Sequence, residues 1–176
     1  MRWPIALALL VSSSTQAKEA TMSDVSVEKH NKEVVRRIFE DSINSGKLEL
    51  LNQLIAEDYV GQGAGPPSGR SAFAATMQAL REGFPDIHYR LEDLVAEGDK
   101  VAVRWQWKGT HRGTFRGPAG VFAPTGKAVS NDGMAIFQLK EGKVVRSWLS
   151  TDRLGFLQEV GGLPKGPGAG AAAPKR

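Results

Sequence analysis

The clearest pattern in the chain is a strict alternation of apolar and polar residues from Val101 to Lys108. A period of two residues predicts a β-strand that buries one face and exposes the other. The predicted buried positions are Val101, Val103, Trp105 and Trp107, and His111 follows at the same parity. A Gly- and Pro-rich loop then extends to Gly126. We interpret residues 99–126 as one wall of an apolar pocket with a histidine at its rim.

Before this strand, apolar residues recur at intervals of three and four, which predicts three amphipathic helices. The first has an apolar stripe over residues 34–43 and ends at 44–46, the second covers 47–56, and the third runs from 70 to about 83. Pro85 stops the third helix. Between the second and third helices, we expect only a short extended piece at 58–60 and a Gly/Pro loop.

After Ile87 the pattern becomes that of strands, with hairpin turns at 97–99 and 140–142. The later strands are predicted at 128–139 and 143–151, and a short helix at 152–160 begins with Asp152 as its N-cap. Helices followed by antiparallel strands indicate the α+β class. A strongly bent sheet around the helices would leave a pocket at its open end.

The length of 176 residues is enough for one domain with a sizeable core. The chain has no cysteine, which excludes disulfides, a thiol nucleophile and cysteine-ligated zinc. Residues 18–32 are predicted to be a flexible lead and helix start, 33–162 the folded domain, and 163–176 a disordered basic tail.

Residues 1–17 have the features of a secretory signal peptide. Arg2 precedes an apolar run that is too short to cross a bilayer, and Thr15 and Ala17 occupy the −3 and −1 positions of a cleavage site. We therefore predict an exported protein, periplasmic or secreted, with no membrane association after cleavage. The alternative is an N-terminal extension without a targeting role.

The formal net charge of +4 suggests a nucleic-acid binder at first sight. The excess lies in Arg2 and in the tail residues Lys165, Lys175 and Arg176, so the charges of residues 18–160 balance. A nucleic-acid groove needs a basic face on the folded part. We therefore expect no nucleic-acid partner.

Three segments together carry a resemblance to a known family: FPDIHYRLEDLVAEGDKVAVRWQWKGTHRGTF, PTGKAV and GMAIFQLKEGKVVRSWLSTDRLGFLQEVG. They resemble the SnoaL-like polyketide cyclases, or ester cyclases, of the nuclear transport factor 2-like superfamily, over 33–162. The resemblance implies a cone-shaped α+β fold, with N-terminal helices packed on a strongly curved antiparallel sheet that encloses an apolar pocket. It also implies a homodimer and a cofactor-free, metal-free aldol closure driven by an acid–base pair.

The chain departs from the family pattern where that pair belongs. The family's aspartate on the last strand and histidine on the preceding strand fall on Leu149 and Ala135, and neither can move a proton. The loop RGPAGVFAPTGK is also longer than in the family, and Phe122 is predicted to reach over the pocket mouth. Either other residues supply the chemistry, or there is none.

His111 and Asp132 are the candidate catalytic residues. The alternatives are a turn histidine bonded to backbone and a solvent-facing or bulge aspartate. Asp152 is more readily a helix cap and Asp86 a turn cap. The predicted pocket lining is Tyr59, Phe84, Trp105, Trp107, Phe122, Ala135, Phe137 and Leu149. Because His30 and His88 have no ligand spacing and no HExxH motif is present, we expect no metal and no cofactor.

These observations leave three hypotheses for the function. The first is an exported ester-cyclase-type protein acting on a small apolar or polyketide-like carbonyl compound, with cofactor-free acid–base chemistry if active. The second is a non-catalytic protein of the same fold that binds such a compound. The third is a dimerisation or interaction module. Fold analogy alone does not choose among them.

Overall fold

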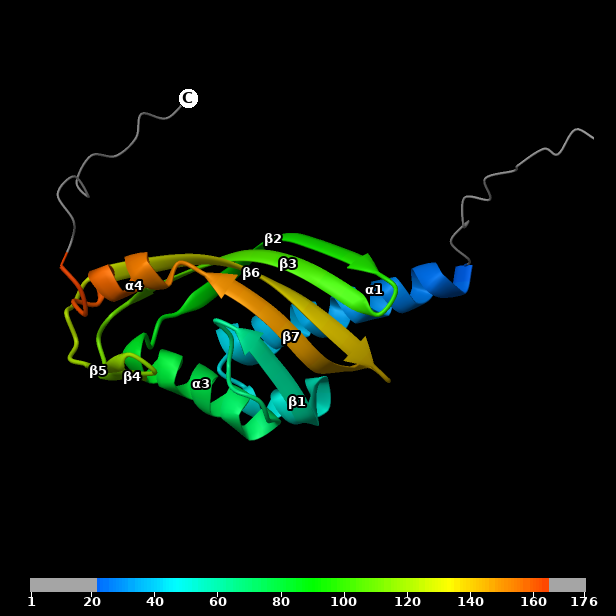
Figure 1. Ribbon diagram of the computed structural model, residues 1–176, viewed down its shortest axis with the longest axis horizontal. Coiled ribbons are helices and arrows are strands. Elements are labelled where there is room, and N and C mark those ends of the chain that lie inside the picture. The colour runs from blue at the N-terminus through cyan, green and yellow to red at the C-terminus, as the bar shows by residue number, and fades with distance from the viewer. Residues whose placement is uncertain (1–21, 165–176) are drawn as a thin grey trace, which may run out of the picture.

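The computed structural model describes residues 22–164, so the predicted signal peptide and nearly all of the predicted tail lie outside the described part of the chain. Figure 1 shows the sheet arching over helices α1 and α3, with α4 and a small hairpin at one end. The elements in chain order are α1 (Met22–Arg37), α2 (Leu51–Leu54), β1 (Ile55–Gly63), α3 (Arg70–Gly83), β2 (His88–Glu97), β3 (Lys100–Thr110), β4 (Phe115–Gly117), β5 (Gly120–Phe122), β6 (Ala128–Lys140), β7 (Lys143–Thr151) and α4 (Arg153–Glu159).

The main sheet has five strands in the order β1-β7-β6-β3-β2. The pairs β2–β3, β3–β6 and β6–β7 are antiparallel, and β4 and β5 form a separate hairpin. The predicted α+β class and the helix-covered curved sheet are confirmed. The turns at Gly98 (φ 57°) and Gly142 (φ 73°) lie where the sequence predicted the hairpins.

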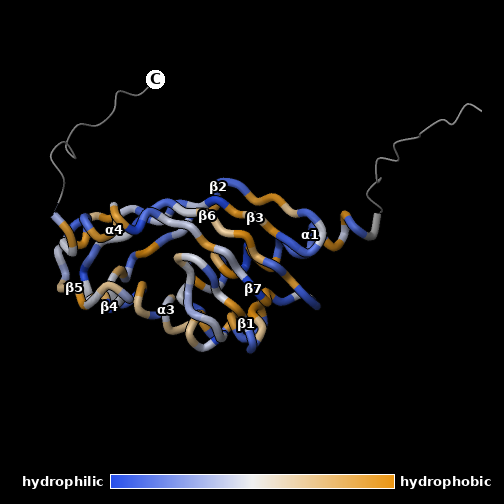
Figure 2. Tube along the Cα trace, viewed as in Figure 1, coloured by the Kyte–Doolittle hydropathy of each residue, from blue (hydrophilic) through white to orange (hydrophobic). Residues whose placement is uncertain are grey.

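The alternation of apolar and polar residues in the sequence corresponds to an alternation of buried and exposed side chains along the strands. β3 buries Val101, Val103, Trp105 and Trp107, and the residues between them are exposed or half-buried. In Figure 2 hydrophobic and hydrophilic positions alternate along the sheet in the same way. We call the buried side, which packs against α1 and α3, the inner face, and the other side the outer face.

The helices are attached to the inner face through rings and backbone groups. Phe39 packs on Phe137 of β6 with ring centroids 6.1 Å apart, and Tyr59 of β1 packs edge-on against Phe73 of α3 at 5.4 Å. Asn44 bonds both backbone groups of Tyr89 in β2, at 2.7 and 2.8 Å. No helix within residues 22–164 has both the length and the apolar character needed to cross a membrane.

Three sequence-based predictions about the elements were wrong. The predicted second helix, 47–56, is only a 3₁₀ turn at Leu48–Leu50 followed by the single turn of α2. The predicted short extended piece is the nine-residue strand β1, which pairs with β7 in parallel, so the sheet is mixed rather than wholly antiparallel. The loop after residue 115 contains the β4–β5 hairpin. Pairing with a strand about 85 residues away leaves no local pattern in the sequence.

The first helix begins at Met22, within the segment 18–32 that was predicted to be a flexible lead and helix start. It continues as a π-helix from Ile38 to Asn44, and Gly46 (φ 72°) ends it, as predicted.

Candidate functional site

Ala135 and Leu149, where the sequence analysis placed the missing acid–base pair, lie directly opposite each other on β6 and β7. Val103 of β3 continues this row across the sheet. One neighbouring row consists of Trp105, Gly133 and Thr151, and the other of Val101, Phe137 and Ser147. Ala135 is only 3% exposed, so this position belongs to the interior. We call this part of the inner face, together with Asn131, the inner site.

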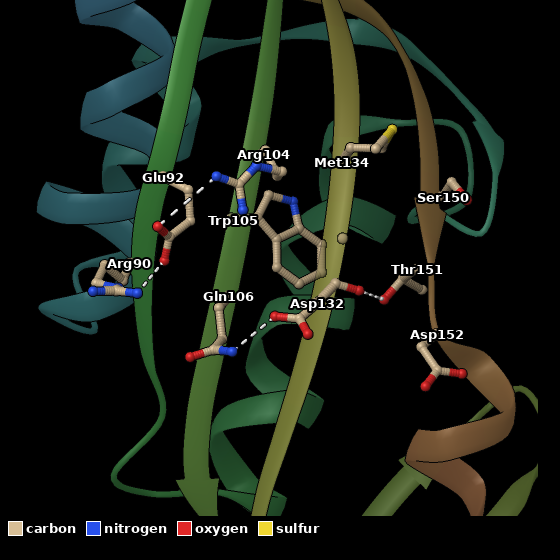
Figure 3. Close-up of a pocket in the computed structure, with 11 residues that line it drawn as sticks. Arg90, Glu92, Arg104, Trp105, Gln106, Asp132, Met134, Ser150, Thr151 and Asp152 are labelled. Carbon is tan, nitrogen blue, oxygen red and sulfur yellow. Dashed lines mark hydrogen bonds and ion pairs between the residues drawn. The ribbon is translucent and has the colours of Figure 1, made fainter. Parts of the chain in front are cut away.

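Gly133 leaves a gap in the inner site that Trp105 fills. A Cβ atom at residue 133 would lie 2.5 Å from Cη2 and 2.9 Å from Cε2 of Trp105, well inside contact distance. The indole therefore extends from β3 across β6, as Figure 3 shows. Its Nε1 is buried and has no hydrogen-bond partner among residues 22–164.

A pair of hydroxyl groups lies on the side of the inner site next to β1. Tyr59 Oη and Ser147 Oγ are 2.5 Å apart, and both side chains are buried. Burial raises the pKa of Tyr59 more than the bond to Ser147 lowers it. The phenol therefore stays protonated at neutral pH and can donate a hydrogen bond, but it is a poor base.

Asn131 and Thr151 close the other side of the site. Thr151 Oγ1 bonds to Asn131 Oδ1 and to the backbone oxygen of Asp132, and Asn131 Nδ2 donates to the backbone oxygen of Asp152 at 2.7 Å. This network fixes the end of β7 where α4 begins. The inner site thus contains hydrogen-bonding groups around an apolar centre, and Ala135 and Leu149 at that centre are not ionisable.

The comparisons with known proteins agree with this architecture. A family model, SnoaL-like polyketide cyclase, matches residues 33–160. This chain belongs to the SnoaL-like polyketide cyclase family. No curated protein matches the chain.

Solved structures of the family superpose on most of the domain. A proposed SnoaL-like polyketide cyclase from Jannaschia sp. CCS1 is 25% identical, with a TM-score of 0.67 over 78% of this chain and 96% of its own. AclR, a proposed hydroxylase from Streptomyces galilaeus, is 25% identical, with a TM-score of 0.69 over 80% and 87% of the two chains. IdmH, a proposed polyketide cyclase from Streptomyces antibioticus, is 28% identical, with a TM-score of 0.61 over 74% and 98%.

His111 lies beyond the inner site of this SnoaL-like protein, in an aromatic cluster. Its ring stacks on Phe84 at 5.0 Å, and Nδ1 is 3.2 Å from Thr125 Oγ1. Nε2 is buried without a partner among the described residues, and burial lowers the pKa of the imidazole. The backbone of His111 bonds to residues 126 and 127, which fixes the long loop at its far end. His111 is thus a neutral, enclosed group at neutral pH.

Asp132, the other catalytic candidate, is not brought together with His111. It accepts a hydrogen bond from Gln106 at 2.9 Å on the outer face. There it lines an open groove of about 530 Å³ with Arg90, Glu92 and Arg104 (Figure 3). The arginines of the two ion pairs in this groove are 71% and 54% exposed, and their shared partner Glu92 is 22% exposed, so the arginines are solvated rather than preorganised for proton transfer.

Asp152 has the structural role that the sequence suggested, whereas Asp86 holds the end of β3 instead of capping a turn. Asp152 caps α4 by accepting from Gly155 N at 2.8 Å. Asp86 accepts from Thr110 N at 2.6 Å and from its hydroxyl at 2.7 Å, and these bonds lower the pKa of Asp86. Within residues 22–164, no group of three or more His, Asp or Glu side chains is arranged to hold a metal ion.

Most of the predicted pocket residues belong to the packed interior. Phe122 and Leu149 are partly buried, and the fully buried ones are Tyr59, Phe84, Trp105, Trp107, Ala135 and Phe137. Phe122 stacks on Phe115 at 6.1 Å and also lies against Gly162, just after α4. Ser147, Asn131 and Gly133 also line the inner site but were not predicted from the sequence. Their parity on the predicted strands, the same as that of Leu149 and Ala135, would have pointed to them.

Proposed function

We propose that this SnoaL-like protein binds a small, largely apolar carbonyl compound of the polyketide type at its inner site and does not perform the family's acid–base step. The observation that carries the proposal is the direct pairing of Ala135 with Leu149 at the centre of the site. Abstraction of a proton next to a carbonyl needs a carboxylate or imidazole within hydrogen-bond reach. Neither side chain can serve.

The other groups around the centre fit binding better than proton transfer. Tyr59 is kept neutral by burial, and Ser147 and Thr151 are ordinary hydroxyls. Together with the rings of Trp105 and Phe137, they form an apolar surface with a few oriented donors and acceptors. That combination is typical of small-molecule sites, where polar groups fix the orientation of a mostly apolar ligand.

Entry to the site leads past α4. This helix begins directly after Thr151, and Phe156 on it packs on Phe84, Trp107 and Phe115 at 5.3–6.0 Å. Its other side chains are half-buried or exposed apart from Val160, so displacing it costs less than opening the sheet.

Native mass spectrometry of the protein purified from its own host tests the proposal. We expect an added mass from a non-covalent apolar compound, which incubation with the protein leaves chemically unchanged. Conversion of that compound would contradict the binder and favour an enzyme. If the protein neither carries nor binds an apolar carbonyl compound, both the binding function and the enzymatic function are refuted.

A second candidate function is catalysis in which His111 serves as the general base in place of the family's acid–base pair. The supporting observation is its buried, unpartnered Nε2 in a ring that is neutral at neutral pH, as a general base must be. Turnover would then rise with pH as the imidazole loses its proton, at a pH below its ordinary pKa of about 6.5, and stay level above that. A His111→Asn variant that folds and retains full turnover would exclude this role.

Dimerisation is proposed through the outer face. Val95, Ala102, Ile136 and Trp148 are aligned in register across four strands, and Val95 and Ile136 are 64% and 43% exposed. Met134 lies on the same face and is 58% exposed. Such a continuous exposed apolar row, flanked by charges of both signs, fits the same row of a second copy. Light scattering of wild type and of Ile136→Asp tests it: a dimer that becomes monomeric is expected.

Export is proposed from residues 1–17, which have the features of a signal peptide. Protein isolated from the host should begin at Lys18. A mature chain that retains the first seventeen residues in the cytoplasm would contradict this.

A further inference from the structure

The indole nitrogen of Trp105 is an unusual group in the interior of this protein. Trp105 is only 4% exposed, and its Nε1 has no hydrogen-bond partner among the described residues. A buried indole N–H normally finds an acceptor, because an unpaired donor loses its hydration without compensation. An unpaired buried donor in a native protein therefore calls for an explanation, such as a ligand atom that it binds.

This nitrogen lies beside Gly133, in the row of the inner face next to that of Ala135 and Leu149. Cε2, the ring atom bonded to Nε1, is one of the Trp105 atoms closest to the missing side chain of Gly133. In Figure 3 the nitrogen lies on the side of the ring toward Met134. Ala135 follows Met134 on β6 and faces inward. The N–H group is therefore next to Gly133 and close to Ala135, the two small inward-facing residues of this part of β6.

The protein groups around this segment supply no acceptor for the N–H. Ala135 and Leu149 are apolar, and the hydroxyl of Thr151 in the same row as Trp105 is held by Asn131 and by the backbone of Asp132. Asn131 uses one hydrogen of its amide on Asp152 and keeps the second. Nε1 is thus a buried donor that has no acceptor among the described residues, which is complementary to a ligand that brings an acceptor oxygen.

We propose that Trp105 Nε1 donates a hydrogen bond to the carbonyl oxygen of a planar aromatic ketone, whose ring system packs against Ala135 and Leu149. The inference rests on the proposed function, since it names the atom that orients the ligand in that same site. Gly133 is required for this arrangement, because any side chain at residue 133 would displace the indole of Trp105.

The test uses two compounds of nearly equal shape, 9-fluorenone and fluorene, which differ by one carbonyl oxygen. Calorimetric titration of the wild-type protein should show tighter binding of 9-fluorenone. Trp105→Phe keeps an aromatic ring but removes the donor. It should weaken 9-fluorenone binding by about 3- to 10-fold more than it changes fluorene binding, and this difference is the value of one hydrogen bond.

Trp107→Phe is the matched control. Trp107 also points inward from β3, but it packs among Tyr89, Phe84 and Phe156 rather than over Gly133. Its replacement should change the affinities for the two compounds by the same factor. If Trp105→Phe does not fold, benzothienylalanine at position 105 replaces the N–H by sulfur in a ring of the same shape.

The outcomes separate the two proposals. Wild-type protein that binds both compounds equally, or a donor-free variant that keeps the preference for 9-fluorenone, overturns the role of Trp105 and leaves the binding function standing. Wild-type protein that binds neither compound overturns the proposed function and the donor role with it. Loss of the preference in the donor-free variant alone supports the assignment.

Discussion

Val103 and Arg104 are neighbours on β3, but they belong to two very different surfaces of one sheet. Val103 is 2% exposed and lies in the row with Ala135 and Leu149. The Arg104 side chain is 54% exposed and pairs with Asp93 at 2.7 Å. On the inner face, stability and ligand binding depend on side-chain volume and on unpaired polar atoms. On the outer face, they depend on solvated charges and on exposed apolar area.

This difference shows why the richest set of charged residues is not the best candidate site. The outer groove contains arginines, Glu92 and Asp132, but water surrounds these groups and weakens their interactions. The inner face offers only a few polar atoms, each held in a dry and rigid setting. There, one unpaired donor has more consequence for a ligand than several exposed ion pairs.

The largest expected difference between the faces concerns ring packing. Phe84 is fully buried and contacts Trp107, His111, Phe115 and Phe156, so Phe84→Ala should lower the free energy of unfolding by about 3–5 kcal/mol. Val95→Ala on the outer face should change it by no more than about 0.5 kcal/mol. Urea unfolding of both variants is the measurement. Equal effects would show that the aromatic cluster is not part of the stable core.

A smaller effect is expected where Trp105 crosses β6. Gly133→Ala adds a Cβ atom that would clash with the Cζ2, Cη2 and Cε2 atoms of the indole, which should destabilise the protein by about 1–3 kcal/mol through overpacking. In a Trp105→Phe background, the same substitution should cost far less, because the shorter ring leaves the gap open. An equal cost in both backgrounds would mean that the backbone of Gly133, rather than the indole, resists the change.

The two faces were predicted from the sequence with unequal success. The alternation in β3 and the hairpin glycines 98 and 142 gave the strands and the sides on which Trp105 and Ala135 lie, because these features are local. The family resemblance singled out Ala135 and Leu149, and the structure shows that they pair directly across β6 and β7. The role of Asp152 as a helix cap was also confirmed, whereas Asp86 binds Thr110 at the end of β3 instead of capping a turn.

What the sequence did not predict depends on contacts between distant segments. β1 owes its conformation to parallel pairing with β7, and nothing within residues 55–63 alone specifies that partner. The bond of Tyr59 to Ser147 is a consequence of the same pairing. The position of the Trp105 indole over Gly133 depends on the register between β3 and β6 and on the rotamer of Trp105. The pattern of residues along one sequence specifies neither of them.

The hydroxyl pair should contribute less than either packing feature. Tyr59→Phe removes the phenol oxygen and leaves Ser147 without its partner, so we expect a loss of about 0.5–1.5 kcal/mol in the free energy of unfolding. Ser147→Ala should cost a similar amount. The double variant should cost less than the sum of the two, since both remove one bond. Strict additivity in this cycle would show that the two hydroxyls do not interact.

The smallest effect is expected at the outer ion pair. Asp93→Asn breaks the bond to Arg104, but both side chains are more than half exposed, at 61% and 54%. Water and salt already weaken such a pair, and two long side chains must be ordered to form it, so the cost should be about 0.2–1 kcal/mol and should shrink as salt is added. Urea unfolding at low and at 1 M salt measures it. A cost that exceeds that of Tyr59→Phe and persists in 1 M salt would show that Asp93 is shielded from water. The contrast between a dry inner face and a solvated outer face would then fail at this edge of the sheet.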